Sequence, residues 1–312
     1  MAGSTPGSLT AEAGTGRALA PQVSPAQDAW RRFRRHRLAV VSGIVLLVMI
    51  LAVLLGPLLW PVAINDIDFT ARLQTPNATH PLGTDDLGQD VLARMLYGGR
   101  ISLSVGLAAM LVSLVVGTLV GAVAGISRGS VDAALMWLTD LFLSLPQLPL
   151  LLVITYLFRD RLKELMGAES SIFILLVAVI GGFSWMPVAR LVRAQFLSLR
   201  EKEFVEAARA LGASTFRQVT RHILPNALGP VIVAGTINVA AAIIAESTLS
   251  FLGLGFPPDT PTWGRLLFDA KDYLDIAPHW ALSAGAAIFL TVLAINFIGD
   301  GLRDVLDPRR VM

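Results

Sequence analysis

The sequence predicts an all-α integral membrane protein with six transmembrane helices and one pair of cytoplasmic helices. Its 312 residues are 54% hydrophobic and only 15% charged, whereas a soluble domain carries about a quarter charged residues. The apolar residues gather in long runs, and a run of about 20 residues matches the hydrocarbon core of a bilayer. One polar stretch between two such runs, residues 197–226, is rich in helix-forming residues.

Six predicted spans follow from these runs. A helix of about 23 residues is about 35 Å long, which is enough to cross a bilayer with some tilt. Pro146 and Pro149 predict a kink in the third span, because proline lacks the backbone N–H that a helix needs. The spans cover residues 38–60, 101–126, 133–157, 171–196, 228–252 and 281–302.

The distribution of basic residues predicts the orientation. With the amino terminus inside, the inner segments hold 17 of the 25 Lys and Arg residues. Cytoplasmic loops of membrane proteins carry such an excess. Both termini and the 197–226 loop are therefore expected in the cytoplasm, and residues 38–312 are expected to form one six-span domain.

The amino-terminal region divides into two parts. Residues 1–27 contain no apolar block, so they predict a disordered cytoplasmic tail rather than a secretory signal. Residues 28–37 alternate Arg with Trp30 and Phe33. A nucleic-acid-binding arm is one interpretation, but a basic interfacial helix that contacts membrane lipid is favoured. The net charge of +2 is too small to indicate nucleic acid.

Residues 61–100 form the largest predicted outer segment. A short helical pattern begins there at Val91, after Asp85, Asp86 and Asp90. Calcium binding is the alternative interpretation of these carboxylates, but the spacing lacks the regular alternation of a calcium loop. Capping of an interfacial helix is favoured, and no metal site is expected. The chain has no cysteine, which excludes disulfides and thiol nucleophiles.

The polar stretch between the fourth and fifth spans predicts two short helices. Residues 197–211 are good helix formers, and Gly212 is expected to end that helix in the left-handed conformation. Ser214 or Thr215 can cap a second helix, which Pro225 is expected to terminate. The two helices would meet at a glycine elbow and form a rigid knob on the inner surface.

This stretch resembles the "EAA" loop of bacterial ABC-transporter permeases, through which a separate ATPase drives the membrane subunit. Glu-Ala-Ala, a glycine six residues after the glutamate, and Leu-Pro shortly before the next span carry the likeness. The resemblance implies docking residues on the first helix and the elbow, with supporting residues beside them. The docking residues are Glu206, Ala207, Ala208 and Gly212, and the supporting residues are Leu211, Leu224 and Pro225.

Three further segments resemble one branch of these permeases. Residues 80–90, 246–255 and 296–309, together with the Arg-His-Ile-Leu-Pro-Asn run at 221–226, are similar to the dipeptide, oligopeptide and nickel permeases. Within that branch the chain resembles the second, C-type subunit. The likeness extends from Trp30 to Arg310, and His222 stands where the broader family usually has isoleucine.

The resemblance implies a transport subunit with no catalytic activity and no cofactor of its own. Two separate ATPase subunits would bind ATP and Mg²⁺, since this chain lacks a phosphate-binding loop. A homologous second permease and an extracytoplasmic substrate-binding protein would complete the assembly in the bacterial cytoplasmic (inner) membrane. Di- and oligopeptides are the favoured substrates, and nickel complexes or another small solute are the alternatives.

Several polar residues fall inside the predicted spans, where charge is costly and usually faces the bundle interior or a wet cavity. Asp140, Glu246 and Asp300 are acidic, and Asn238 and Asn296 are polar. Asn238 and Glu246 lie two turns apart and share one helix face. They are candidates for a translocation pathway. For Glu246 and Asp300, an interhelical or helix-end hydrogen bond is favoured.

A stripe of small residues marks the second span. It repeats every four residues and predicts close approach of a partner helix. The stripe consists of Ser113, Gly117, Gly121 and Gly125.

Two other functional classes are weaker. A secondary transporter would need paired charges at mid-membrane and broken helices in related halves. A membrane enzyme would need clustered His, Asp, Glu or Ser near one surface. Neither pattern is clear in the sequence.

Overall fold

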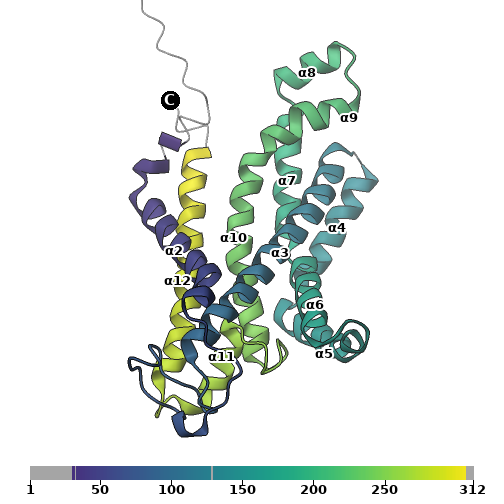
Figure 1. Ribbon diagram of the computed structural model, residues 1–312. Coiled ribbons are helices and arrows are strands. Elements are labelled where there is room, and N and C mark those ends of the chain that lie inside the picture. Colours follow the sequence, from purple (N-terminus) through teal and green to yellow (C-terminus); the bar gives the residue numbers. More distant parts are fainter. Residues whose placement is uncertain (1–29, 32, 128, 307–312) are drawn as a thin grey trace, which may run out of the picture.

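The computed structural model describes residues 30–31, 33–127 and 129–306, and this part of the chain consists of helices joined by loops, without a named strand. Figure 1 shows an elongated bundle. The short helices α8 (Glu203–Ala210) and α9 (Thr215–Gln218) project from one end, and α11 (Trp263–Ala270) lies at the other. We call these the α8 end and the α11 end. The predicted tail 1–27 lies outside the described residues.

The described chain has the six predicted spans when each of two bent helix pairs is counted as one. Four single helices are long and apolar enough to cross a membrane, and the pairs bend by 86° and 41°. The single helices are α2 (Arg37–Leu59), α3 (Val91–Ile126), α10 (Leu224–Phe251) and α12 (Pro278–Leu306). The pairs are α4 (Ser130–Ser144) with α5 (Gln147–Met166), and α6 (Ala168–Gly182) with α7 (Trp185–Leu199).

The 86° bend between α4 and α5 lies at Pro146, which confirms the predicted kink. Proline forces the preceding residue out of the helical region, and Leu145 accordingly has a ψ of 138°. Pro149 lies in the first turn of α5, where its missing N–H is tolerated. Figure 1 shows α5 turned away from the direction of α4.

Helix α3 begins at Val91, before the predicted start of the second span at residue 101. Asp90 starts the helix, because its Oδ1 accepts a hydrogen bond from the Ala93 amide at 2.7 Å. No proline separates this cap from the apolar run that follows. The expected interfacial helix is therefore the first part of α3.

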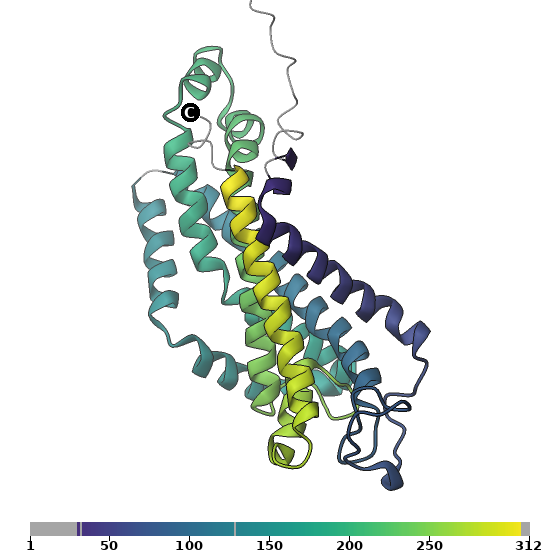
Figure 2. The same cartoon turned by 90° about the vertical axis from the view of Figure 1, so that its left-hand side faces the viewer.

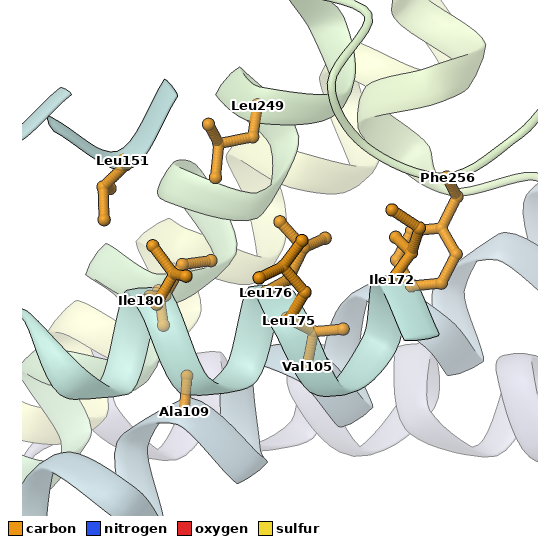
Figure 3. Close-up of a cluster of buried hydrophobic side chains, with 11 residues drawn as sticks. Val105, Ala109, Leu151, Ile172, Leu175, Leu176, Ile180, Leu249 and Phe256 are labelled. Carbon is orange, nitrogen blue, oxygen red and sulfur yellow. The ribbon is translucent and has the colours of Figure 1, made fainter. Parts of the chain in front are cut away.

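One buried cluster joins α3, α5, α6 and α10 near the middle of the bundle (Figure 3). Leu176 and Ile180 of α6 and Leu249 of α10 are fully buried within it. Phe256, from the loop after α10, covers the cluster on one side. Since lipid tails are as apolar as leucine, close packing holds such helices together in a membrane. This cluster fixes α6 against α3.

The small-residue stripe of α3 packs against α7, as the spacing predicts. A Cβ added to Gly117 would lie 2.6 Å from the Cβ of Val188 and 2.7 Å from the carbonyl oxygen of Trp185. A Cβ on Gly125 would lie 2.5 Å from that of Phe196. The side chains on the opposite face of α3 are exposed: Leu107, Leu111, Val115, Leu119 and Val123.

Gly117→Ala should destabilise the protein by about 1–3 kcal/mol, because the added methyl group forces α3 and α7 apart. Gly43→Ala in α2 is the matched control, since a Cβ there meets nothing within 4 Å. The control should unfold at the same temperature as the wild type or slightly above it. Thermal unfolding of the detergent-solubilised protein measures both changes. Equal stability of the two variants would show that the α3–α7 contact is looser than described.

Arg94 ties α3 to the α11 end. Its Nη2 donates to the Pro258 carbonyl at 3.1 Å and lies 3.9 Å from an Asp269 oxygen, while its Nε lies 3.7 Å from Asp85. Burial raises the pKa of both the Asp85 and the Asp269 carboxyl above the ordinary value. The loop before α3 and helix α11 therefore form one connected layer.

The basic segment before α2 is helical at residues 30–31 and 33–35, and Trp30 stacks on Phe33 at 6.0 Å between ring centroids. His36 Nε2 lies 3.8 Å from Asp304 of α12. Figure 2 shows α12 running the length of the bundle, with α2 starting beside one end of it and running obliquely away. The start of α2 and the end of α12 thus lie at the α8 end. The location of this segment at a lipid surface stays a prediction.

Candidate coupling site

The first helix of the polar stretch is shorter than predicted, because a turn at residues 200–202 separates α7 from α8. Lys202 has extended backbone angles, φ −89° and ψ 144°. The Nη1 group of Arg200 donates to the Gly125 carbonyl at 3.2 Å, at the carboxyl end of α3. The turn is therefore anchored on a neighbouring span and redirects the chain into α8 away from the axis of α7 (Figure 1).

Gly212 ends α8 as the sequence predicts. Its φ is +81°, in the left-handed region that favours glycine. Its amide donates to the Arg209 carbonyl at 2.9 Å, and the Ala213 amide donates to the Ala208 carbonyl at 3.0 Å. These two bonds form a Schellman motif, which satisfies the last carbonyls of the helix. The elbow therefore has a defined backbone geometry.

The second helix begins at Ser214, whose Oγ accepts from the Arg217 amide at 3.4 Å. The predicted termination at Pro225 is wrong, because α9 continues through a π-helical turn, η2 (Val219–Ile223), into α10. Pro225 lies in the first turn of α10, where a missing N–H is tolerated. The elbow is consequently continuous with the fifth span.

One face of α8 is packed onto the bundle. Val205 is fully buried and Ala208 is 9% exposed. Val205 belongs to a cluster with Phe196 of α7, Ile223 of the π-helical turn and Ala227 of α10. These contacts hold α8 on the ends of two spans, so the elbow moves with them.

The other face of the elbow is open. Glu206 and Ala207 are exposed on α8, and Gly212 is exposed at the turn. Leu211 is 89% exposed and Phe216 is 77% exposed. The elbow therefore exposes two large apolar side chains that no described residue covers.

The residues implied by the EAA resemblance fall into two groups. Glu206, Ala207, Leu211 and Gly212 lie on the open face, and Ala208 faces the bundle. Leu224 is half-buried beneath the elbow, and Pro225 is exposed. Their roles in docking stay predictions.

Glu246 lies at the centre of an interhelical network. It is fully buried, and its carboxylate accepts hydrogen bonds from Ser102 of α3 at 3.0 Å and from Ser250 at 2.8 Å. Ser247 lies 3.4 Å away, and the Trp263 amide of α11 donates to Ser102 Oγ at 3.3 Å. This geometry supports the interhelical interpretation, since it joins α3, α10 and α11.

The other intramembrane candidates lie apart from one another. Asn238 donates to Ser113 Oγ of α3 at 2.9 Å, so it and Glu246 use the same face of α10. Asp140 pairs with Arg190 of α7, and both side chains are at least half exposed. Asn296 and Asp300 lie on the exposed side of α12. The structure does not bring these five residues into one site.

Sequence reasoning missed a second link between α4 and α7. Arg193 donates from Nε and Nη2 to the two carboxylate oxygens of Asp132, both at 2.6 Å. Such bidentate pairs are directional and strong. This ion pair is hard to predict from the sequence. Arg193 lies near the 197–226 loop, and the excess of basic residues on the inner side of the membrane already accounts for an arginine there.

Comparison with known families gives two matches. Residues 117–312 match the model of the binding-protein-dependent transport system inner membrane component. Residues 24–76 match the N-terminal TM domain of oligopeptide transport permease C. The second match covers α2 and the region around it, and the first covers the elbow.

Curated relatives cover nearly the whole chain. The chain is 42% identical over 285 residues to the oligopeptide transport system permease protein OppC of Escherichia coli (strain K12), covering 91% of each protein. It is 38% identical to the dipeptide transport system permease protein DppC of Alkalihalophilus pseudofirmus, covering 92% of this chain and 91% of that one. It is 37% identical to the glutathione transport system permease protein GsiD of Pectobacterium atrosepticum, covering 92% of each.

A solved structure shares the fold. An inward-facing conformation of the MetNI methionine ABC transporter contains a chain that matches with a TM-score of 0.54 and 19% identity. The match covers 68% of this chain and 95% of the other. Bent spans also occur in secondary transporters, but the relatives are permease subunits. The chain belongs to the family of binding-protein-dependent transport system inner membrane components, as an importer permease of the bacterial inner membrane.

Proposed function

We propose that this chain is the C-type permease subunit of an ATP-driven importer of di- and oligopeptides, and that the α8 elbow couples it to the ATPases. The observation that carries the proposal is an exposed elbow fixed to two spans. Val205 anchors it on α7 and α10, while Leu211 and Phe216 stay open. Relatives that transport peptides support the substrate class.

The elbow can transmit a force to the bundle because both of its ends are firmly connected to a span. Helix α8 joins α7 through the anchored turn at 200–202, and α9 joins α10 without a break. A push on α8 therefore moves α7 and α10 together as a packed unit. Closure of two ATPase subunits around ATP and Mg²⁺ supplies that push, since this chain carries transport and not ATP hydrolysis.

A homologous second permease is proposed to cover the exposed stripe of α3, which includes Leu111 and Val115. An extracytoplasmic substrate-binding protein is proposed to contact the α11 end. The α8 end then faces the cytoplasm, which places the start of α2 and the end of α12 on that side. This orientation agrees with the excess of Lys and Arg in the inner segments.

Reconstitution tests the function. The chain should co-purify with ATPase subunits and a second permease encoded in the same organism, and liposomes containing the full assembly should accumulate trialanine only with ATP and binding protein. Failure to bind ATPase subunits, or nucleotide-independent uptake, would contradict the importer function. Uptake of nickel complexes without uptake of any peptide would contradict the substrate class alone.

A further inference from the structure

An open pocket with a mostly apolar lining lies between α3 and α6, in the half of the bundle nearer the α11 end. Its volume is about 420 Å³, which is within the usual range for small-ligand sites. One wall is apolar and includes Phe173, Ile174 and the buried Phe256. Arg100 of α3 and Glu169 of α6 also line it. The cavity thus offers both signs of charge beside an apolar surface.

Arg100 is held in place by helix α2. Its Nε donates to the Val53 carbonyl at 2.8 Å, and its Nη2 donates to the Leu54 carbonyl at 2.7 Å. In a regular helix the Val53 carbonyl accepts from the amide four residues later, but that residue is Pro57, which has no N–H. The Arg100 guanidinium therefore donates to a carbonyl that has no donor within its own helix. A guanidinium has five N–H donors, and among the described residues Arg100 donates only from Nε and Nη2, which leaves Nη1 for a ligand.

Glu169 supplies the opposite charge. It lies in the first turn of α6 with its side chain exposed, and its carboxylate is within hydrogen-bond range of the Tyr97 hydroxyl on α3. Arg100 and Glu169 line the same cavity, yet no ion pair joins them in the described part of the chain. Each group can still bind part of a ligand that carries a cation and an anion: Arg100 through Nη1, and Glu169 through the carboxylate lone pairs that Tyr97 does not use.

We propose that this cavity is a substrate subsite that binds the two charged ends of a short peptide during transport. The peptide carboxylate would accept from Arg100 Nη1, and the peptide ammonium group would donate to Glu169. Charge-assisted hydrogen bonds of this kind are stronger than neutral ones. The apolar wall formed by Phe173 and Ile174 accommodates side chains of varied shape. This inference rests on the proposed import of peptides.

Uptake by the complete reconstituted importer tests the subsite. The probes are trialanine, trialanine amide and N-acetyltrialanine, each at saturating occupancy of the binding protein. For each probe, uptake by the variant is divided by uptake by the wild type. The same binding protein is used in both assays, so its preference among the probes cancels in this ratio. Arg100→Gln should reduce uptake of trialanine about tenfold more than uptake of the amide. Glu169→Gln should reduce uptake of trialanine about tenfold more than uptake of N-acetyltrialanine.

A double variant separates recognition from structure. Pro57→Ala restores the amide that the Val53 carbonyl lacks, so Pro57→Ala combined with Arg100→Gln repairs the support of α2 without restoring the guanidinium. We expect the double variant to regain expression and stability but not the preference for a free carboxylate. Equal loss for all three probes, or recovery of the preference in the double variant, would overturn the subsite. If the wild type takes up none of the probes, peptide import itself fails.

Discussion

Gly212→Val is expected to reduce ATP-dependent uptake about tenfold or more while leaving the amount of folded protein in the membrane unchanged. A β-branched residue is strongly disfavoured at the φ of +81° found there, and such strain costs about 1–3 kcal/mol. The strain is expected to open the Schellman motif between α8 and α9 and so to change the position of α8 relative to α9. Uptake and ATPase binding by the reconstituted assembly measure the effect.

Gly129→Val is the matched control for this substitution. Gly129 also has a positive φ, +76°, and a Cβ at either glycine meets nothing within 4 Å. Gly129 lies in the loop before α4, at the same end of the bundle but outside the elbow. Gly129 has a ψ of −129°, so valine is strained there too, and this strain outside the elbow should leave ATPase binding intact. Comparable losses from both variants would show that the defect is general and not specific to the elbow.

Glu246→Ala is expected to lower the free energy of unfolding by about 3 kcal/mol or more. The substitution leaves the hydroxyls of Ser102 and Ser250 without their acceptor in a dry interior, and each such group costs about 1–3 kcal/mol. A cavity adds to the loss. Thermal unfolding in detergent measures the change, and uptake should fall in proportion to the folded protein that remains.

Glu246→Gln distinguishes a structural role from a role in the pathway. Glutamine has nearly the same shape, and its amide oxygen can still accept from Ser102 or Ser250. This variant should retain most of the stability and uptake. Normal stability combined with lost uptake in Glu246→Gln would instead assign the carboxylate to the translocation pathway.

The architecture follows largely from patterns that the sequence shows directly. Long apolar runs predict the six spans, Pro146 predicts the sharp bend, and Gly212 predicts the end of α8. Each depends on a local physical constraint: the thickness of a bilayer, a missing N–H or a positive φ. The Gly117 stripe is equally local, although its partner helix, α7, is visible only in the structure.

The helix ends that differ from the prediction share one cause. The effect of a residue on a helix depends on the structure of the residues before and after it. Pro225 ends a helix by its chemistry alone, but the π-helical turn before it places it in the first turn of α10. Helix α3 likewise starts at Val91 and runs into the predicted second span, since nothing interrupts it before the apolar run. Arg100 lies at the end of the predicted outer segment 61–100, but in the structure it is part of α3. The partner of Arg100 is visible only in the structure, because the carbonyl that Pro57 leaves without a donor lies on another helix, α2.

Accessibility of a single cysteine on α8 tests the elbow most directly. The chain has no native cysteine, so Ala207→Cys, and Ser130→Cys as a control at the same end, each introduce one thiol on an exposed position. Both should react with a membrane-impermeant maleimide only from the cytoplasmic side. Bound ATPase subunits should protect Cys at position 207 and leave Cys at position 130 reactive. Labelling at 207 from the outside, or at an unchanged rate in the assembled importer, would contradict the coupling role of the elbow.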